Sequence, residues 1–142
     1  MIIGCIPVYN EEDFIRRSVG SLQGVCDRII VVDGAYSDFP LINDAHHSTD
    51  DTLRIAREMG AEVIFAEKPW PDQVAKRNEL LRGRDGDYYI FLDADEKFEG
   101  VFYPDIDSEQ AYLVQCWNYK NNRVSQDILR IFRHDQGIEF RG

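Results

Sequence analysis

Three carboxylates crowd into four positions of this chain. Asp93, Asp95 and Glu96 follow an apolar run in the stretch "YYIFLDADEKFEG", residues 88–100. Like charges this close repel one another, so a positive group must hold them. Alternation along an extended chain points Asp93 and Asp95 to the same side, where one cation can meet both. Mg²⁺ and Mn²⁺ take one or two protein carboxylates and fill their other positions with water and substrate phosphate oxygens. The spacing therefore predicts a Mn²⁺ or Mg²⁺ site for a diphosphate ligand, although strand-to-loop turns are also rich in Asp.

A fourth carboxylate, Asp33, ends another apolar run, "RIIVVD", at residues 28–33. At the end of a buried strand, a carboxylate can accept hydrogen bonds from a nucleobase N–H or a ribose hydroxyl. The alternative is ordinary turn capping before Gly34.

Strand-length apolar runs alternate with helical patterns in the first part of the chain. The expected strands are residues 2–8, 28–33, 61–66 and 87–93, and the expected helices are residues 11–22, 48–60 and 71–83. Asn10 is predicted to cap the first helix, and Ser48 the second, with Asp51 completing a capping box. Two further strand patterns, residues 111–119 and 127–134, follow with no helix between them and are joined by a polar stretch.

This order predicts an α/β fold: a mostly parallel sheet with helices on both faces and an antiparallel C-terminal edge. Ligands of such sheets gather at the carboxyl ends of the strands, here residues 8–10, Asp33 and residues 93–95. The 142 residues contain no repeat and no linker-like segment, so we expect a single domain over residues 1–142.

Composition narrows the classes of partner. The chain has 16 basic and 26 acidic residues and a formal charge of −10, which repels nucleic acid. Its apolar runs are far shorter than the roughly 20 residues of a membrane span, and no signal-type segment opens it. The three cysteines match neither a disulfide framework nor a zinc pattern. We expect a cytoplasmic protein, and peripheral association with a membrane stays open.

Five blocks of the chain resemble a known family. "IPVYNEE", "IIVVDG", "STDDTLRIAREMGAEVI", "QVAKRNELL" and "YYIFLDADE" are similar, in this order, to the blocks of family 2 glycosyltransferases and cover residues 2–96. "RIFRHDQGIEFRG" further resembles a segment of the subgroup similar to lipopolysaccharide core glycosyltransferases. The resemblance implies the GT-A fold and a nucleoside-diphosphate sugar as donor, usually with uracil as base. It also implies inverting transfer to an acceptor hydroxyl, and leaves the acceptor open among glycans, lipids and proteins.

The resemblance also implies roles for single residues. Pro7, Tyr9 and Glu11 lie where family members line the nucleotide pocket. Asp33 matches the acidic residue that contacts the base. Lys76 and Arg77 fall in the helix whose basic residues face the nucleotide-sugar, although exposure on a solvated helix face is the alternative for both. Asp93 matches the carboxylate near the ribose or metal-bound water, and Asp95 matches the metal ligand.

One segment departs from the family pattern. The stretch "AYSDFPLINDAHH", residues 35–47, separates two blocks that are usually contiguous in the family. A long loop of this kind could be a lid over the sugar or a specificity loop. His46 and His47, together with Asp44 and Asp50, suggest a metal site, but adjacent histidine side chains point apart in an extended chain, which favours a surface loop.

The chain reaches its last residues, "FRG", before the His-Glu pair of that subgroup. An inverting transferase needs a general base, and no residue matches it, so the catalytic residue is unassigned. The alternatives are a chain truncated at its C-terminus, a minimal variant, or a nucleotide-sugar-binding module or inactive remnant. A half-built domain would leave apolar surface uncovered, which favours a homo-oligomer.

Two other enzyme classes fit less well. A haloacid dehalogenase-type phosphatase expects Thr or Val where Lys97 stands, and a sugar nucleotidyltransferase expects a glycine-rich loop, which "IPVYNEE" lacks.

Overall fold

The structure is a computed structural model that describes residues 1–38, 45–82, 84–103, 111–118, 123–133 and 139–141. Its helices are α1 (Glu12–Leu22), α2 (Thr52–Glu58) and α3 (Gln73–Glu79). Its strands are β1 (Ile2–Val8), β2 (Arg28–Asp33), β3 (Glu62–Phe65), β4 (Tyr88–Phe91), β5 (Ala111–Asn118) and β6 (Arg123–Arg133).

The described strands form one sheet in the order β3-β2-β1-β4-β6-β5. β1 to β4 run parallel, whereas β6 pairs antiparallel with both β4 and β5. The predicted mostly parallel sheet with an antiparallel C-terminal edge is thus confirmed. Val8 pairs with Asp33 across β1 and β2, so the carboxyl ends of these strands meet at one edge of the sheet.

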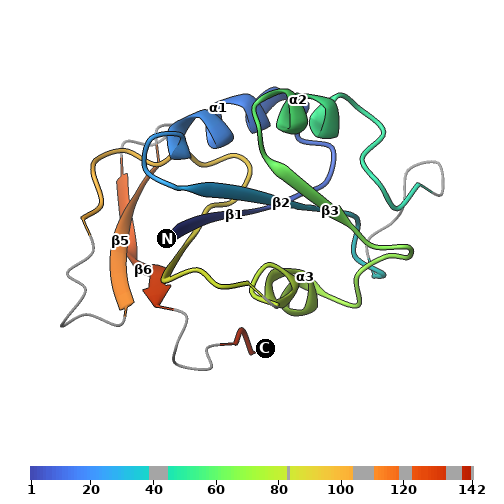
Figure 1. Cartoon of the computed structure of the whole chain (residues 1–142). Helices are drawn as coiled ribbons and strands as arrows, with labels where there is room; N and C mark the ends of the chain where they lie inside the picture. The colour runs from blue at the N-terminus through green and yellow to red at the C-terminus, as the bar shows by residue number, and fades with distance from the viewer. Residues whose placement is uncertain (39–44, 83, 104–110, 119–122, 134–138, 142) are drawn as a thin grey trace.

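Helices cover both faces of the sheet, with α1 and α2 on one side and α3 on the other (Figure 1). Alternate residues of a strand point to opposite faces. In β1, Ile6 and Val8 belong to the core beneath α1 and α2, whereas Ile3 and Cys5 belong to the core that includes Leu80 after α3. Burial on both faces explains why the parallel strands are apolar almost throughout.

The helix ends differ from two of the predicted caps. Asn10 does not cap α1: it has a φ of 54°, and Glu11 takes the cap position without a side-chain bond. Ser48 does not cap α2, whose cap residue is Asp51. Both predictions were wrong because these side chains make long-range bonds instead. The Ser48 hydroxyl accepts a bond from the N–H of Asn10, and the Asn10 side chain accepts one from the N–H of Thr49. At α3 the carboxylate of Asp72 accepts a bond from the N–H of Ala75 at 2.7 Å.

β6 begins at Arg123, inside the polar stretch that was expected to be a connection. In the described part of the chain, no helix is long and apolar enough to cross a membrane.

Candidate functional site

A pocket of about 430 Å³ opens at the carboxyl ends of β1, β2 and β4. It brings together six of the residues predicted from the sequence: Pro7, Tyr9, Glu11, Lys76, Asp93 and Asp95. The lining also includes residues that the sequence did not single out: Val8, Phe14, Gly34, Ala35, Tyr36, Gln73 and Ala94. Asp33 and Arg77 are not part of the lining. Asp33 bonds Ser48, and Arg77 bonds Asp93 of the lining.

A reciprocal set of hydrogen bonds, here called the clasp, joins residues 10–12 to residues 48–52. The backbone N–H groups of residues 10, 11 and 12 donate to the side chains of Ser48, Thr52 and Asp50 at 2.8, 2.7 and 3.1 Å. In return, the N–H groups of residues 49 and 51 donate to the side chains of Asn10 and Glu12 at 2.8 and 2.9 Å. The clasp fixes the turn that carries Tyr9 and Glu11 into the pocket.

Asp33 is fully buried, and its carboxylate bonds inward. It accepts one bond from the N–H of Ser48 at 3.0 Å and another from the Ser48 hydroxyl at 2.5 Å. His47 Nδ1 lies 3.7 Å from the same carboxylate. Asp33 therefore ties β2 to the segment before α2, 15 positions away, which differs from the expected capping of the local turn before Gly34. Its contact with a base stays a prediction.

Lys76 reaches the site from α3 and is only 2% exposed. Its ammonium donates to the carbonyl oxygens of Val8 at 2.6 Å and Gly34 at 2.5 Å, and so it bridges the ends of β1 and β2. Burial lowers the pKa of Lys76 to about 8, although the negative charges of Asp33 and Glu11 oppose that shift. The alternative of a solvated helix face was wrong for Lys76.

The crowded carboxylates lie on a turn and not on an extended strand. β4 ends at Phe91, and the N–H of Glu96 donates to the carbonyl of Asp93 at 2.9 Å. The prediction from strand alternation was therefore wrong in its geometry, yet Asp93 and Asp95 both line the pocket. A tight turn brings the two side chains to the same pocket in another way.

Two arginines supply the positive charge that the carboxylates require. Arg77 Nη2 donates to Asp93 Oδ1 at 2.8 Å. Arg130 Nη2 donates to Asp93 Oδ2 at 3.1 Å and to Glu96 Oε1 at 2.8 Å. Sequence analysis missed Arg130, and the one signal was a basic residue within the apolar pattern "ILRIF" of an expected strand.

Asp95 differs from Asp93 in having no such partner in the described ranges of the chain. Its side chain is exposed, and its carboxylate makes no hydrogen bond with the described residues. The pKa of Glu11 is raised, first by burial and next by the negative charge of Asp95. A cation bound at Asp95 would relieve this repulsion.

These residues fit a divalent cation that arrives with a diphosphate. No group of three or more His, Cys, Asp and Glu side chains converges as a metal site within the described ranges. Mg²⁺ and Mn²⁺ do not require such a group, because water and phosphate oxygens can complete their coordination. Asp95 is the better direct ligand, since both oxygens of Asp93 already accept bonds from arginines.

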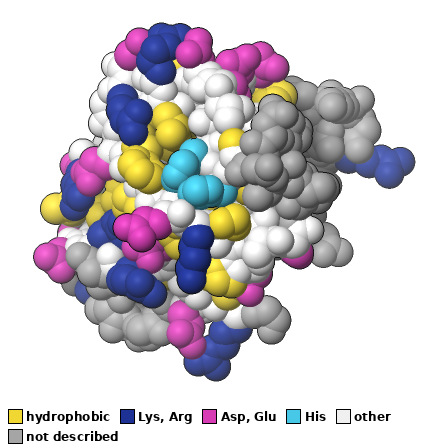
Figure 2. All heavy atoms as spheres, turned by 90° about the vertical axis from the view of Figure 1, so that its right-hand side faces the viewer, with side chains coloured by type: hydrophobic (Ala, Val, Ile, Leu, Met, Phe, Trp, Pro, Cys, Tyr) yellow, Lys and Arg dark blue, Asp and Glu magenta, His cyan; other side chains and the backbone are white. Residues whose placement is uncertain are grey.

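Histidine side chains (cyan) lie together on the surface in Figure 2. His46 and His47 are neighbours in space as well as in sequence. Their ring centroids are 4.0 Å apart, so the expectation that the two side chains point apart was wrong. His47 also packs edge-on against Phe65 at 5.1 Å. Asp50, the third residue of the suggested metal site, already accepts bonds from the clasp, and Asp44 lies outside the described residues. No metal site forms around the two histidines among the described residues.

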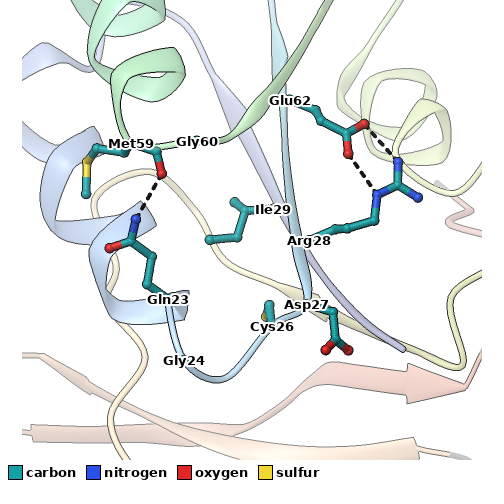
Figure 3. A pocket seen from close by; sticks show the side chains of 9 residues that line it. All are labelled: Gln23, Gly24, Cys26, Asp27, Arg28, Ile29, Met59, Gly60 and Glu62. Carbon is teal, nitrogen blue, oxygen red and sulfur yellow. Dashed lines mark hydrogen bonds and ion pairs between the residues drawn. The ribbon is translucent and has the colours of Figure 1, made fainter.

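A second pocket of about 260 Å³ lies near the amino end of β2 (Figure 3). It shares no lining residue with the first pocket. Its polar groups bond one another: Arg28 pairs with Glu62 through two bonds, and Gln23 donates to the carbonyl of Met59. Burial raises the pKa of the Cys26 thiol there to about 12, which keeps it protonated. We therefore do not expect a catalytic or metal-binding site in this pocket.

The sequence model of glycosyl transferase family 2 matches residues 5–131, which span most of the strands and helices described above. The chain belongs to this family. An uncharacterized glycosyltransferase of Rickettsia typhi is 30% identical over 128 residues, which cover 89% of this chain and 38% of that relative. The chain thus spans about two fifths of the length of the curated relatives it matches.

Two solved structures share the fold. Glucosyl-3-phosphoglycerate synthase from Mycobacterium tuberculosis, in complex with Mn²⁺, uridine diphosphate and glucosyl-3-phosphoglycerate, is 27% identical with a TM-score of 0.51, and the match covers 66% of this chain and 33% of that one. TarS of S. aureus, in complex with UDP-GlcNAc, is 26% identical with a TM-score of 0.50 over 66% of this chain and 26% of that one. The expected GT-A fold is confirmed, whereas the narrower resemblance to the lipopolysaccharide core subgroup stays a prediction.

Proposed function

We propose that this domain binds a nucleoside-diphosphate sugar, with uracil as the base, together with Mn²⁺ or Mg²⁺. It transfers the sugar to an acceptor hydroxyl with inversion. The observation that carries the proposal is the pocket at the carboxyl ends of β1, β2 and β4, which gathers six residues predicted to bind the donor or its metal. Two similar structures hold uridine diphosphate with Mn²⁺ or UDP-GlcNAc, which supports the same donor class here.

Asp95 is the residue that would hold the metal, with Asp93 beside it on the same turn. When bound, a divalent ion supplies Lewis-acid stabilisation of the negative charge that develops on the leaving diphosphate. The Lys76 ammonium, held in place by its bonds to Val8 and Gly34, contributes positive charge to the pocket. Arg77 is not part of the lining but bonds Asp93, so it adds positive charge close to the proposed diphosphate site.

The remaining residues shape and orient the pocket. The Tyr9 hydroxyl donates to the carbonyl of Ala45 at 2.7 Å, which fixes its ring at the end of β1. The arginines hold Asp93 in place before any ligand binds, which reduces the ordering cost of binding. The general base stays unassigned, and the acceptor, the cytoplasmic location and a homo-oligomer stay predictions.

Calorimetric titration with UDP, with and without Mn²⁺, tests the proposal. We expect Mn²⁺ to strengthen UDP binding by the whole chain. Replacing one direct carboxylate ligand should remove this gain, so Asp95→Asn should weaken UDP binding in Mn²⁺ about tenfold or more. Asp85→Asn is the matched control, because Asp85 is exposed and precedes β4 at the opposite end of the strand. UDP affinity that neither Mn²⁺ nor Asp95→Asn changes would contradict the proposal.

Turnover separates a transferase from a module that only binds the donor. A UDP-sugar incubated with the chain and Mn²⁺ should release UDP, by hydrolysis or by transfer to an added acceptor. Tight donor binding with no release, with or without candidate acceptors, would favour the binding module.

A further inference from the structure

The insertion, residues 35–47, is anchored at its base against the segment before α3. The N–H of Ala35 donates to the carbonyl of His46 at 2.9 Å, which closes the loop. Trp70 donates its N–H to Ala35 at 2.9 Å and accepts a bond from the N–H of Ser37 at 2.8 Å. Its indole Nε1 also donates to the carbonyl at the end of β2 at 2.8 Å. Tyr36 therefore lies between two residues, Ala35 and Ser37, that are bonded to Trp70. It forms an isolated parallel β-bridge with Trp70.

The Tyr36 side chain is part of the pocket lining. The Lys76 ammonium lies 5.2 Å from the centroid of its ring, a distance at which a cation is attracted to the aromatic face. Burial raises the pKa of Tyr36, so its hydroxyl stays neutral at physiological pH, while the charges of Arg77 and Asp93 lie close enough to influence it. The ring thus lies beside the Lys76 ammonium, in the same pocket lining as Asp93 and Asp95.

The chemistry of this wall indicates which part of the donor it meets. Lys76 and Asp95 offer the fixed charge and the metal ligand that a diphosphate needs, whereas an aromatic ring best matches a planar base or the apolar face of a ribose. We propose that the insertion supplies Tyr36 as a donor-binding residue, whose ring contacts the nucleoside of the bound donor. This inference rests on the proposed function of the same pocket.

UDP titrations of Tyr36→Ala and Tyr36→Phe in Mn²⁺ test this role of the ring. Loss of aromatic contact with a base typically weakens binding about fivefold or more, so we expect Tyr36→Ala to lose at least that much affinity. Tyr36→Phe keeps the ring and should stay within about twofold of the unchanged chain. Ser37→Ala is the matched control, since Ser37 is the next residue, is exposed and bonds Pro71 outside the pocket.

Thermal midpoints of each variant separate a loss of binding from a loss of fold. If Tyr36→Ala does not fold, Tyr36→Leu takes its place, because leucine fills similar space without an aromatic face. An Ala or Leu variant that binds UDP as tightly as the unchanged chain would overturn the inference. The inference would also be overturned if Tyr36→Phe weakened UDP binding as much as Tyr36→Ala, because the effect would then come from the hydroxyl and not from the ring. These results would contradict only the role of Tyr36 if the unchanged chain binds UDP and Asp95→Asn abolishes the increase in UDP affinity caused by Mn²⁺. If the unchanged chain binds no UDP, both proposals are wrong.

Discussion

Asp93 and Asp95 are only two positions apart, yet the structure gives them different environments. Asp93 is held by Arg77 and Arg130, whereas the carboxylate of Asp95 faces the pocket without a bond to the described residues. The two arginines offset the negative charge of Asp93 and Glu96 before any ligand binds. A metal is therefore not needed to hold the turn together, and the proposed metal at Asp95 would act only on the bound donor and in the reaction.

We expect Lys76 to make donor binding in the pocket depend on pH. Its pKa is lowered to about 8, so its ammonium is charged in the ligand-free chain below that pH and increasingly neutral above it. A bound diphosphate favours the charged form, so binding above the pKa must take up a proton, and affinity falls as the pH rises. We expect UDP affinity in Mg²⁺ to drop about tenfold between about pH 7 and pH 9.

Lys76→Met is the matched variant for this prediction. It removes the titrating group but keeps an unbranched side chain in the same buried place. We expect UDP binding that is weaker than normal at neutral pH and nearly independent of pH over the same range. A variant that keeps the full pH slope would show that another group titrates.

At the scale of elements, the site depends on contacts between segments that are distant in the sequence. The clasp joins the start of α1 to the segment before α2, and Lys76 of α3 bonds the ends of β1 and β2. Arg130 of β6 reaches back to the turn after β4. The antiparallel edge of the sheet is therefore part of the support of the site.

Arg130→Gln should loosen this support. The variant removes one of the two positive charges beside Asp93 and Glu96. Burial already raises the pKa of Glu96, and we expect it to rise further without Arg130. Because these carboxylates are partly exposed, we expect the free energy of unfolding to fall by only about 1–2 kcal/mol at neutral pH, measured by urea titration. The loss should shrink in mild acid, where protonation of Glu96 removes one of the repelling charges.

Arg54→Gln is the control for this prediction. Arg54 also bonds two carboxylates, Asp51 and Glu58, but on the exposed surface of α2, where ion pairs contribute little to stability. If the two variants lose equal stability, the support from Arg130 is no stronger than a surface ion pair.

Gly34 is the point where β2 turns into the insertion, and its replacement should be costly. It has a φ of 127°, a conformation that side chains disfavour, and a Cβ there would lie 2.9 Å from Trp70 Nε1. We expect Gly34→Ala to lower the free energy of unfolding by about 1–3 kcal/mol. Gly24→Ala should cost less, because Gly24 has a positive φ of 83° but no atom within 4 Å of an added Cβ. Equal losses would mean that contact with Trp70 is unimportant.

For the whole molecule, the sequence predicted the sheet and the pocket well because both follow from local patterns. Apolar runs of strand length marked the buried parallel strands, and parallel strands place their carboxyl ends together. The residues after β1 and β4 therefore reached one pocket, as expected. The single domain over residues 1–142 stays a prediction.

The contacts that the sequence could not predict are long-range. Asn10 and Ser48 look like ordinary helix caps in isolation, and only their meeting in the folded chain converts them into partners across the clasp. Arg130 lies 37 positions from Asp93, and no local pattern pairs them. Tyr36 sits in a stretch outside every family block, so only the structure reveals its place in the pocket.

The central claim is that the turn after β4 binds a divalent cation together with the diphosphate of a nucleotide donor. A crystal structure of the chain with UDP and Mn²⁺ tests it most directly. The account predicts Mn²⁺ on the carboxylate of Asp95, the diphosphate on the ion, and the nucleoside in the pocket against Tyr36. A structure in which the pocket stays empty at saturating UDP and Mn²⁺, with Asp95 directed into solvent, would contradict it.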